Sequence, residues 1–221
     1  MRVQAKGAAA TTTVRRRAGS IESVRKPRAD GQRNRERLME AAKAAFAEVG
    51  ADVSLEEIAR RAGVGIGTLY RHFPTRDAIV EAVYRREVWQ LASSAERLLG
   101  EVRPGDALHQ WMRLFVDYIA TKKVIASALS ALVGGTGDLY AASGAQITGA
   151  MSLLVQRAAA AGDIRADADP EDLLRALIGF TYGANGPGWQ ASALRLIDLL
   201  TDGLKPQRPS VSPSRAGPDR F

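Results

Sequence analysis

The 221-residue sequence contains no cysteine, which excludes disulfide bonds, catalytic thiols and cysteine-based zinc sites. It also has no run of about 18 uncharged apolar residues, so we expect no transmembrane helix. The N-terminal segment carries scattered arginines and lacks the apolar core of a secretory signal. Together these absences favour a cytoplasmic protein.

Recognisable catalytic patterns are also scarce. No Ser/His/Asp series, carboxylate pair or metal-ligand spacing stands out. His109 has no partner pattern and is interpreted as a surface residue. The closely spaced glycines from Gly63 to Gly67 do not make a dinucleotide-binding loop, because the third glycine position is Thr68 and no strand precedes it. We therefore expect no catalytic residues, no metal and no cofactor.

The net charge of +7 is distributed unevenly along the chain. Residues 1–30 carry +6, residues 204–221 carry +3, and the segment between them carries −2. Neither end shows apolar periodicity, and the C-terminal one is rich in proline. Both ends are predicted to be disordered tails, and the basic N-terminal one would add nonspecific affinity for phosphate.

Between the tails the apolar residues follow helical periodicity, and no segment alternates as a strand would. The predicted fold class is therefore all-α. The first core helix, over residues 33–49, places Leu38, Ala42 and Phe46 on one face. Later helices are predicted over residues 76–99, 104–121, 122–133, 141–161, 170–184 and 189–202.

Two short helices across a tight turn are predicted within residues 54–73. Ser54 is a favourable N-cap, and Glu57 stands where a capping-box carboxylate would reach back. Gly63 falls where a left-handed C-cap residue is needed, and the second helix runs over residues 66–73. This arrangement is the helix-turn-helix pattern.

The stretch AGVGIGTLYRHFPTRDAI, residues 62–79, resembles the DNA-binding signature of the TetR family of transcriptional regulators. It departs from that signature at Gly65, where the family more often has a serine cap, and at Ile66, where a polar or basic residue is frequent. The stretch AGDIRADADPEDLL, residues 161–174, is similar to C-terminal domains of SbtR-like members.

The resemblance implies a helix-turn-helix DNA-binding domain over residues 31–78 and a helical ligand-binding and dimerisation domain over residues 79–203. Ile66, Leu69 and Phe73 share the apolar side of the second short helix, which should face the other helices. The resemblance implies that Gly67 and Thr68 approach base edges, whereas Tyr70 and His72 lie against phosphates. The residues expected to contact DNA are Gly67, Thr68, Tyr70, Arg71 and His72.

One apolar side chain and three aromatic ones recur every three or four positions and form one helical stripe: Leu108, Trp111, Phe115 and Tyr118. Such a stripe is usually only core. The resemblance implies the alternative, that these helices enclose an apolar or aromatic effector. The expected lining is Trp111, Phe115, Tyr118, Met151 and Phe180, with Gln146 and Asn185 as polar anchors.

Small residues on the penultimate predicted helix, together with the apolar last helix, are expected to form a four-helix interface with a second copy of the chain. The alternative is burial within one chain, since small residues also let helices of a monomer approach. The residues assigned to the interface are Ala176, Gly179, Gly183, Leu194 and Ile197.

The sequence therefore predicts a TetR-like homodimer that binds a near-palindromic double-stranded DNA operator. We expect it to be a repressor that a small ligand releases from DNA. An activator or a ligand-independent regulator is the alternative within DNA binding. A helical small-molecule-binding protein or enzyme is the alternative of a different class.

Overall fold

The computed structural model describes residues 25–50, 52–132, 135–183 and 186–206, and these contain helices and connecting turns without strands. The predicted all-α class is confirmed. Both expected tails lie mainly outside the described residues. The helices are α1 Arg25–Val49, α2 Leu55–Ala62, α3 Ile66–His72, α4 Arg76–Glu101, α5 Pro104–Val124, α6 Ala126–Ser130, α7 Gly137–Ala160, α8 Pro170–Tyr182 and α9 Trp189–Leu204.

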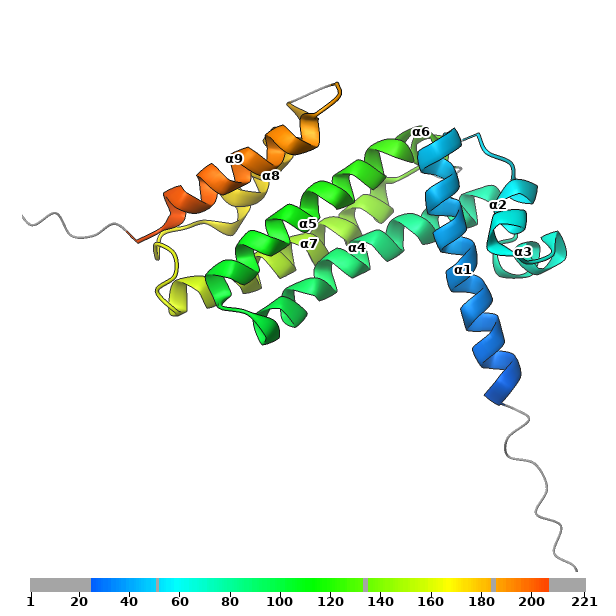
Figure 1. Cartoon of the computed structure of the whole chain (residues 1–221), viewed down its shortest axis with the longest axis horizontal. Helices are drawn as coiled ribbons and strands as arrows, with labels where there is room; N and C mark the ends of the chain where they lie inside the picture. Colours follow the sequence, from blue (N-terminus) through cyan, green and yellow to red (C-terminus); the bar gives the residue numbers. More distant parts are fainter. Residues whose placement is uncertain (1–24, 51, 133–134, 184–185, 207–221) are drawn as a thin grey trace, which may run out of the picture.

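Helices α1, α2 and α3 form a small unit at the N-terminal end of α4 (Figure 1). Their shared core includes Phe46 of α1, Ile58 of α2 and Leu69 of α3, all of which are buried. Helix α1 also packs directly on α4. The orientation of the small unit is therefore tied to the long helix.

Local sequence signals set the turn between α2 and α3. The Ser54 hydroxyl accepts a hydrogen bond from the Glu57 amide at 3.1 Å, as a helix N-cap should. Gly63 ends α2 with φ 65° and ψ 36°, the left-handed conformation that favours glycine. The second half of the expected capping box is absent, because the Glu57 carboxylate accepts from Arg60 and Arg61 instead.

The Ser54 cap gives a direct test of helix-turn-helix stability. We expect Ser54→Ala to lower the free energy of unfolding by about 1 kcal/mol, because the amide of Glu57 loses its acceptor. Urea denaturation followed by circular dichroism measures this. The matched control is Ser93→Ala on the exposed side of α4, which should change stability by less than about 0.5 kcal/mol. Equal losses in the two variants would show that the cap does not stabilise α2.

The larger unit is a bundle in which α4, α5 and α7 run side by side, with α8 and α9 covering one side (Figure 1). Helix α5 is the central element, since it packs against α4, α7 and α9. Trp111 and Met112 of α5 are fully buried, as are Met151 and Leu154 of α7. None of the helices in the described ranges combines the length and apolar composition that crossing a bilayer requires.

Several helix boundaries differ from the sequence-based prediction. Helix α1 begins at Arg25, so residues 25–30, which were assigned to the disordered tail, are helical. Pro27 is compatible with this because it lies in the first turn, where an amide hydrogen has no partner within the helix. Helix α5 continues to Val124, and the predicted separate helix over residues 122–133 is reduced to the short α6.

Candidate nucleic-acid interface and internal cavity

Helix α3 buries one side and exposes the other. Leu69 and the adjoining Phe73 are buried in the three-helix unit, which fixes how the helix is rotated. As a result, the five residues predicted to contact DNA all retain exposed surface. Gly67, Tyr70 and Arg71 are exposed, and Thr68 and His72 are half-buried.

Ile66 was expected on the buried side of α3, and this prediction is wrong. The side chain is 37% exposed. Ile66 is the first residue of the helix, directly after the Gly65 cap, so no preceding helical turn covers it. An apolar side chain therefore lies at the N-terminal end of the exposed surface of α3.

The N-terminal half of α1 lies beside the end of α3 through Arg35. Its guanidinium carbon is 4.5 Å from the centre of the Phe73 ring, and Nη1 donates to the His72 carbonyl oxygen at 3.4 Å. Sequence reasoning missed this residue, because the contact joins helices whose relative placement no local pattern reveals. Arg35 therefore helps to hold the C-terminal end of α3 in position.

The basic residues of α2 are paired with acids. The hydrogen bond from Arg60, with a smaller contribution from the one from Arg61, lowers the pKa of Glu57 to about 2. Its carboxylate therefore stays ionised. Arg61 also pairs with Glu48 of α1 at 2.6 Å. Arg71 of α3, by contrast, has no ion pair with any residue the structure describes. Of these arginines, Arg71 is the one left available to an external anion.

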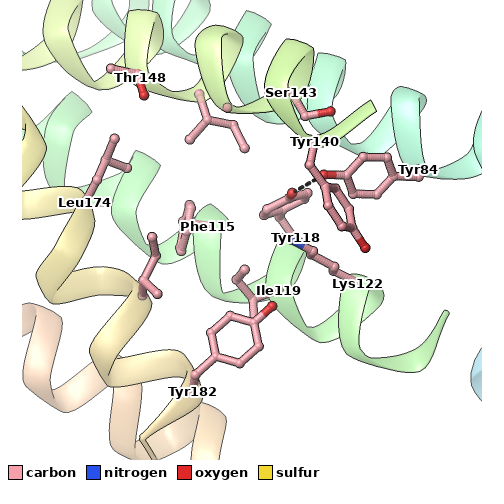
Figure 2. Close-up of a pocket in the computed structure, with 13 residues that line it drawn as sticks. Tyr84, Phe115, Tyr118, Ile119, Lys122, Tyr140, Ser143, Thr148, Leu174 and Tyr182 are labelled. Atoms are coloured by element: carbon pink, nitrogen blue, oxygen red, sulfur yellow. Dashed lines mark hydrogen bonds between the residues drawn. The ribbon is translucent and has the colours of Figure 1, made fainter. Parts of the chain in front are cut away.

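A cavity of about 330 Å³, partly open to solvent, lies in the larger unit between α4, α5, α7 and α8. One end carries Tyr84, Tyr140 and Lys122, whereas Leu174 and Thr148 lie at the other (Figure 2). The lining residues are Tyr84, Phe115, Tyr118, Ile119, Lys122, Tyr140, Ser143, Gly144, Ile147, Thr148, Leu174, Ile178 and Tyr182.

Tyrosines form the polar end of the cavity. The hydroxyl oxygens of Tyr84 and Tyr118 are 3.2 Å apart, and the Tyr84 and Tyr140 rings meet edge to face with centres 5.7 Å apart. Burial raises the pKa values of Tyr118, Tyr140 and Tyr182 above the ordinary value for tyrosine. These three hydroxyls therefore remain neutral and protonated near neutral pH.

Of the residues that were expected to bind an effector, some line the cavity and others do not. Phe115 and Tyr118 line the cavity. Trp111 does not, because it is fully buried and its indole nitrogen donates to the Leu91 carbonyl oxygen at 2.8 Å. Met151 is likewise buried away from the cavity lining, and Phe180 packs against the core from a half-buried position outside it.

The expected polar anchors and His109 can be compared with the structure in the same way. Gln146 is exposed and outside the cavity lining, and Asn185 lies outside the described residues. The residues that sequence reasoning missed, Tyr84, Lys122 and Tyr140, come from three different helices. His109 does have a partner, since its Nε2 is 2.8 Å from an Asp198 carboxylate oxygen across the contact between α5 and α9.

The residues predicted to form the dimer interface differ in their exposure to solvent. Gly179 and Gly183 are exposed, and Ala176 and Leu194 are half-buried. Ile197 is fully buried against its own chain, so its assignment to an intermolecular surface is wrong. The large apolar residues of α8 and α9 that are exposed are Ile178, Tyr182 and Leu199. In the described part of the chain, no group of acidic and histidine side chains could hold a metal ion.

Each of the two units matches a known protein family. The model for bacterial regulatory proteins of the tetR family matches residues 38–83, and the model for the C-terminal domain of SbtR-like transcriptional regulators matches residues 103–206. HTH-type transcriptional regulators of Staphylococcus aureus are 29% identical over 103 residues, which is 46% of this chain and 54% of theirs. The chain thus spans about half the length of these curated relatives.

Solved structures match over more of the chain. A TetR transcriptional regulator from Streptomyces coelicolor is 46% identical with a TM-score of 0.71, and the match covers 79% of this chain and 99% of that one. A TetR regulatory protein from Mycobacterium vanbaalenii is 36% identical with a TM-score of 0.69, covering 81% and 99% respectively. Members of this family are transcriptional regulators and not enzymes. The chain belongs to the TetR family and has an N-terminal helix-turn-helix domain followed by an SbtR-like helical domain.

Proposed function

We propose that the protein is a homodimeric repressor that leaves a near-palindromic operator when a small apolar or aromatic effector occupies the cavity. The observation that carries this proposal is the course of α4. This helix contributes Tyr84 to the cavity, and its first turn follows α3 after the short connection from Phe73 to Thr75. A displacement of α4 would therefore move α3.

The contact between α1 and α4 supports the same coupling. Glu87 of α4, which is largely buried, pairs with Lys43 of α1 at 2.7 Å, one turn beyond the cavity residue Tyr84. The DNA-binding unit is thus attached to α4 both through the chain and through this ion pair. Two recognition helices must be about 34–36 Å apart to meet successive major grooves. An effector would act by favouring a state with the wrong separation.

Selection of bound DNA from a random pool, followed by a ligand screen for loss of binding, tests the proposal. We expect one palindromic sequence to be enriched, with salt-sensitive affinity. A ligand that strengthens binding would indicate an activator or co-repressor mode. Failure to enrich any sequence would contradict operator recognition and favour a helical small-molecule-binding protein.

Thr68 should contribute to sequence choice. It is half-buried on α3, and its hydroxyl and methyl groups suit contact with a base pair. We expect Thr68→Ala to cost about 1–3 kcal/mol of binding free energy on the selected operator and little on random DNA. Fluorescence anisotropy titrations on both DNAs measure the difference.

Tyr70→Phe is the matched comparison on the same helix. Tyr70 is exposed, and its hydroxyl is proposed to contact a phosphate, so its loss should weaken binding to both DNAs alike. Equal losses on the two DNAs for Thr68→Ala would remove Thr68 from the residues that read bases.

A further inference from the structure

The cavity lining that the structure describes contains one cationic side chain, and no described residue supplies a counter-anion to it. Lys122 is half-buried, and among the described residues it has neither an ion pair nor a hydrogen-bond acceptor. Its ammonium nitrogen is 4.5 Å from the centre of the Tyr140 ring and 5.9 Å from that of Tyr84. Aromatic faces stabilise a cation less than a paired carboxylate does, so the charge remains available to an anion.

A hydroxyl donor is also available at this end of the cavity. Tyr84 and Tyr118 together carry two O–H groups, and the contact between their oxygens uses one of them. The other O–H has no acceptor among the described residues. Because the buried phenol of Tyr118 stays protonated, it does not compete for the lysine charge.

The remainder of the lining is apolar. Phe115, Ile147, Leu174 and Ile178 form the walls away from Lys122, and Figure 2 shows Leu174 at the end of the cavity opposite Tyr84. The volume of about 330 Å³ is at the lower end of the range for small-molecule sites. The site therefore suits a compact ligand with one polar end.

We propose that the effector is a small monocarboxylic acid with an aromatic or branched aliphatic body, whose carboxylate pairs with Lys122 and accepts a hydrogen bond from the tyrosine pair. This inference rests on the proposed function, because it names the chemical class of the effector. The single positive charge matches a monoanion. The lining offers no arginine or second lysine, as a phosphate dianion would require.

The test compares acids with neutral ligands of the same shape, using the full-length protein without DNA. The probes are 4-phenylbutanoate, 1-naphthaleneacetate and 4-methylpentanoate, each paired with its primary amide. Isothermal titration calorimetry gives the Kd values. We expect at least one acid to bind about 10- to 100-fold more tightly than its amide, the range for a hydrogen bond to a charged group.

Variants of Lys122 separate charge recognition from cavity shape. Lys122→Met keeps a similar length without the charge, and should remove the preference for the acid while leaving amide binding unchanged. Lys122→Arg should restore part of the preference. Lys205→Met is the control, because Lys205 is exposed and pairs with Asp202 at the end of α9, outside the cavity. Circular dichroism melting checks that each variant is folded.

The outcomes distinguish the ligand class from the proposed function. Amides that bind as tightly as the acids, an acid preference that survives in Lys122→Met, or no binding by any acid at millimolar concentration would each overturn the carboxylate assignment. An acid that binds through Lys122 but leaves the operator complex intact would support the assignment. That result would contradict effector release instead.

Discussion

Replacing Trp111 with alanine is expected to lower the free energy of unfolding by about 3–5 kcal/mol. Trp111 is fully buried in α5, with its ring 6.1 Å from that of Phe115, and its indole nitrogen donates to the Leu91 carbonyl oxygen of α4. The variant would leave a cavity where α4 and α5 pack together. Urea denaturation monitored by circular dichroism measures the loss.

Two further variants show whether the loss of stability in Trp111→Ala comes from the buried position of Trp111. Trp111→Phe keeps most of the apolar volume and should cost less than the alanine variant while preserving effector binding, since Trp111 does not line the cavity. Trp89→Ala is the matched exposed control, because Trp89 is 63% exposed on α4, and it should change stability by less than about 0.5 kcal/mol. Loss of effector binding in a stably folded Trp111→Phe variant would return Trp111 to the binding site.

Features that depend on neighbouring residues in the sequence were predicted well. Ser54 caps α2 and Gly63 takes the left-handed conformation between α2 and α3, as predicted. The predicted helix starts at residues 76 and 170 are also correct: Thr75 caps α4, and Asp169 accepts from the amides of Glu171 and Asp172 at the start of α8. Each of these interactions spans three residues or fewer along the chain. The amino-acid sequence alone therefore contains the information that determines them.

The cavity could not be predicted in the same way. Trp111 and Tyr118 lie on one helical stripe, yet Trp111 is covered by α4 and Tyr118 reaches the space beside α7 and α8. Periodicity identifies the buried side of a helix but not which neighbour covers each turn. Lys122 was missed for a related reason, because the sequence suggested a helix break there and α5 instead continues to Val124.

The same reasoning explains the error at Ile197. Helix α9 is apolar on more than one side, so the sequence indicates that it is covered without indicating by what. Ile197 packs within the chain, in a helix that contacts α5 and α8, whereas Leu199, two residues further on, is 68% exposed. At about 100° of rotation per residue, the two side chains point about 200° apart around the helix axis, that is, to nearly opposite sides. Only the tertiary packing decides which of them is available to a partner.

An arginine at position 179 is expected to abolish specific operator binding without unfolding the chain. Gly179 is exposed and a Cβ atom added there meets no described atom within 4 Å, so a side chain can leave the backbone toward solvent without a clash at its first atom. The exposed Ile178, Tyr182 and Leu199 lie on the same two helices, α8 and α9. If this surface packs against its copy in the proposed homodimer, the arginine would both separate the helices and bury an unpaired charge.

Because one recognition helix reaches only one half-site, loss of the dimer should reduce operator affinity about 10³-fold or more, to the nonspecific level. Sedimentation velocity, circular dichroism and anisotropy titration on the operator together measure assembly, folding and binding. Gly100→Arg is the control, since Gly100 is exposed near the C-terminal end of α4 and also has no atom within 4 Å of an added Cβ. It should remain a dimer with normal affinity. A folded dimeric Gly179→Arg protein that binds the operator normally would place Gly179 outside the interface, and the dimer would then have to form through another surface.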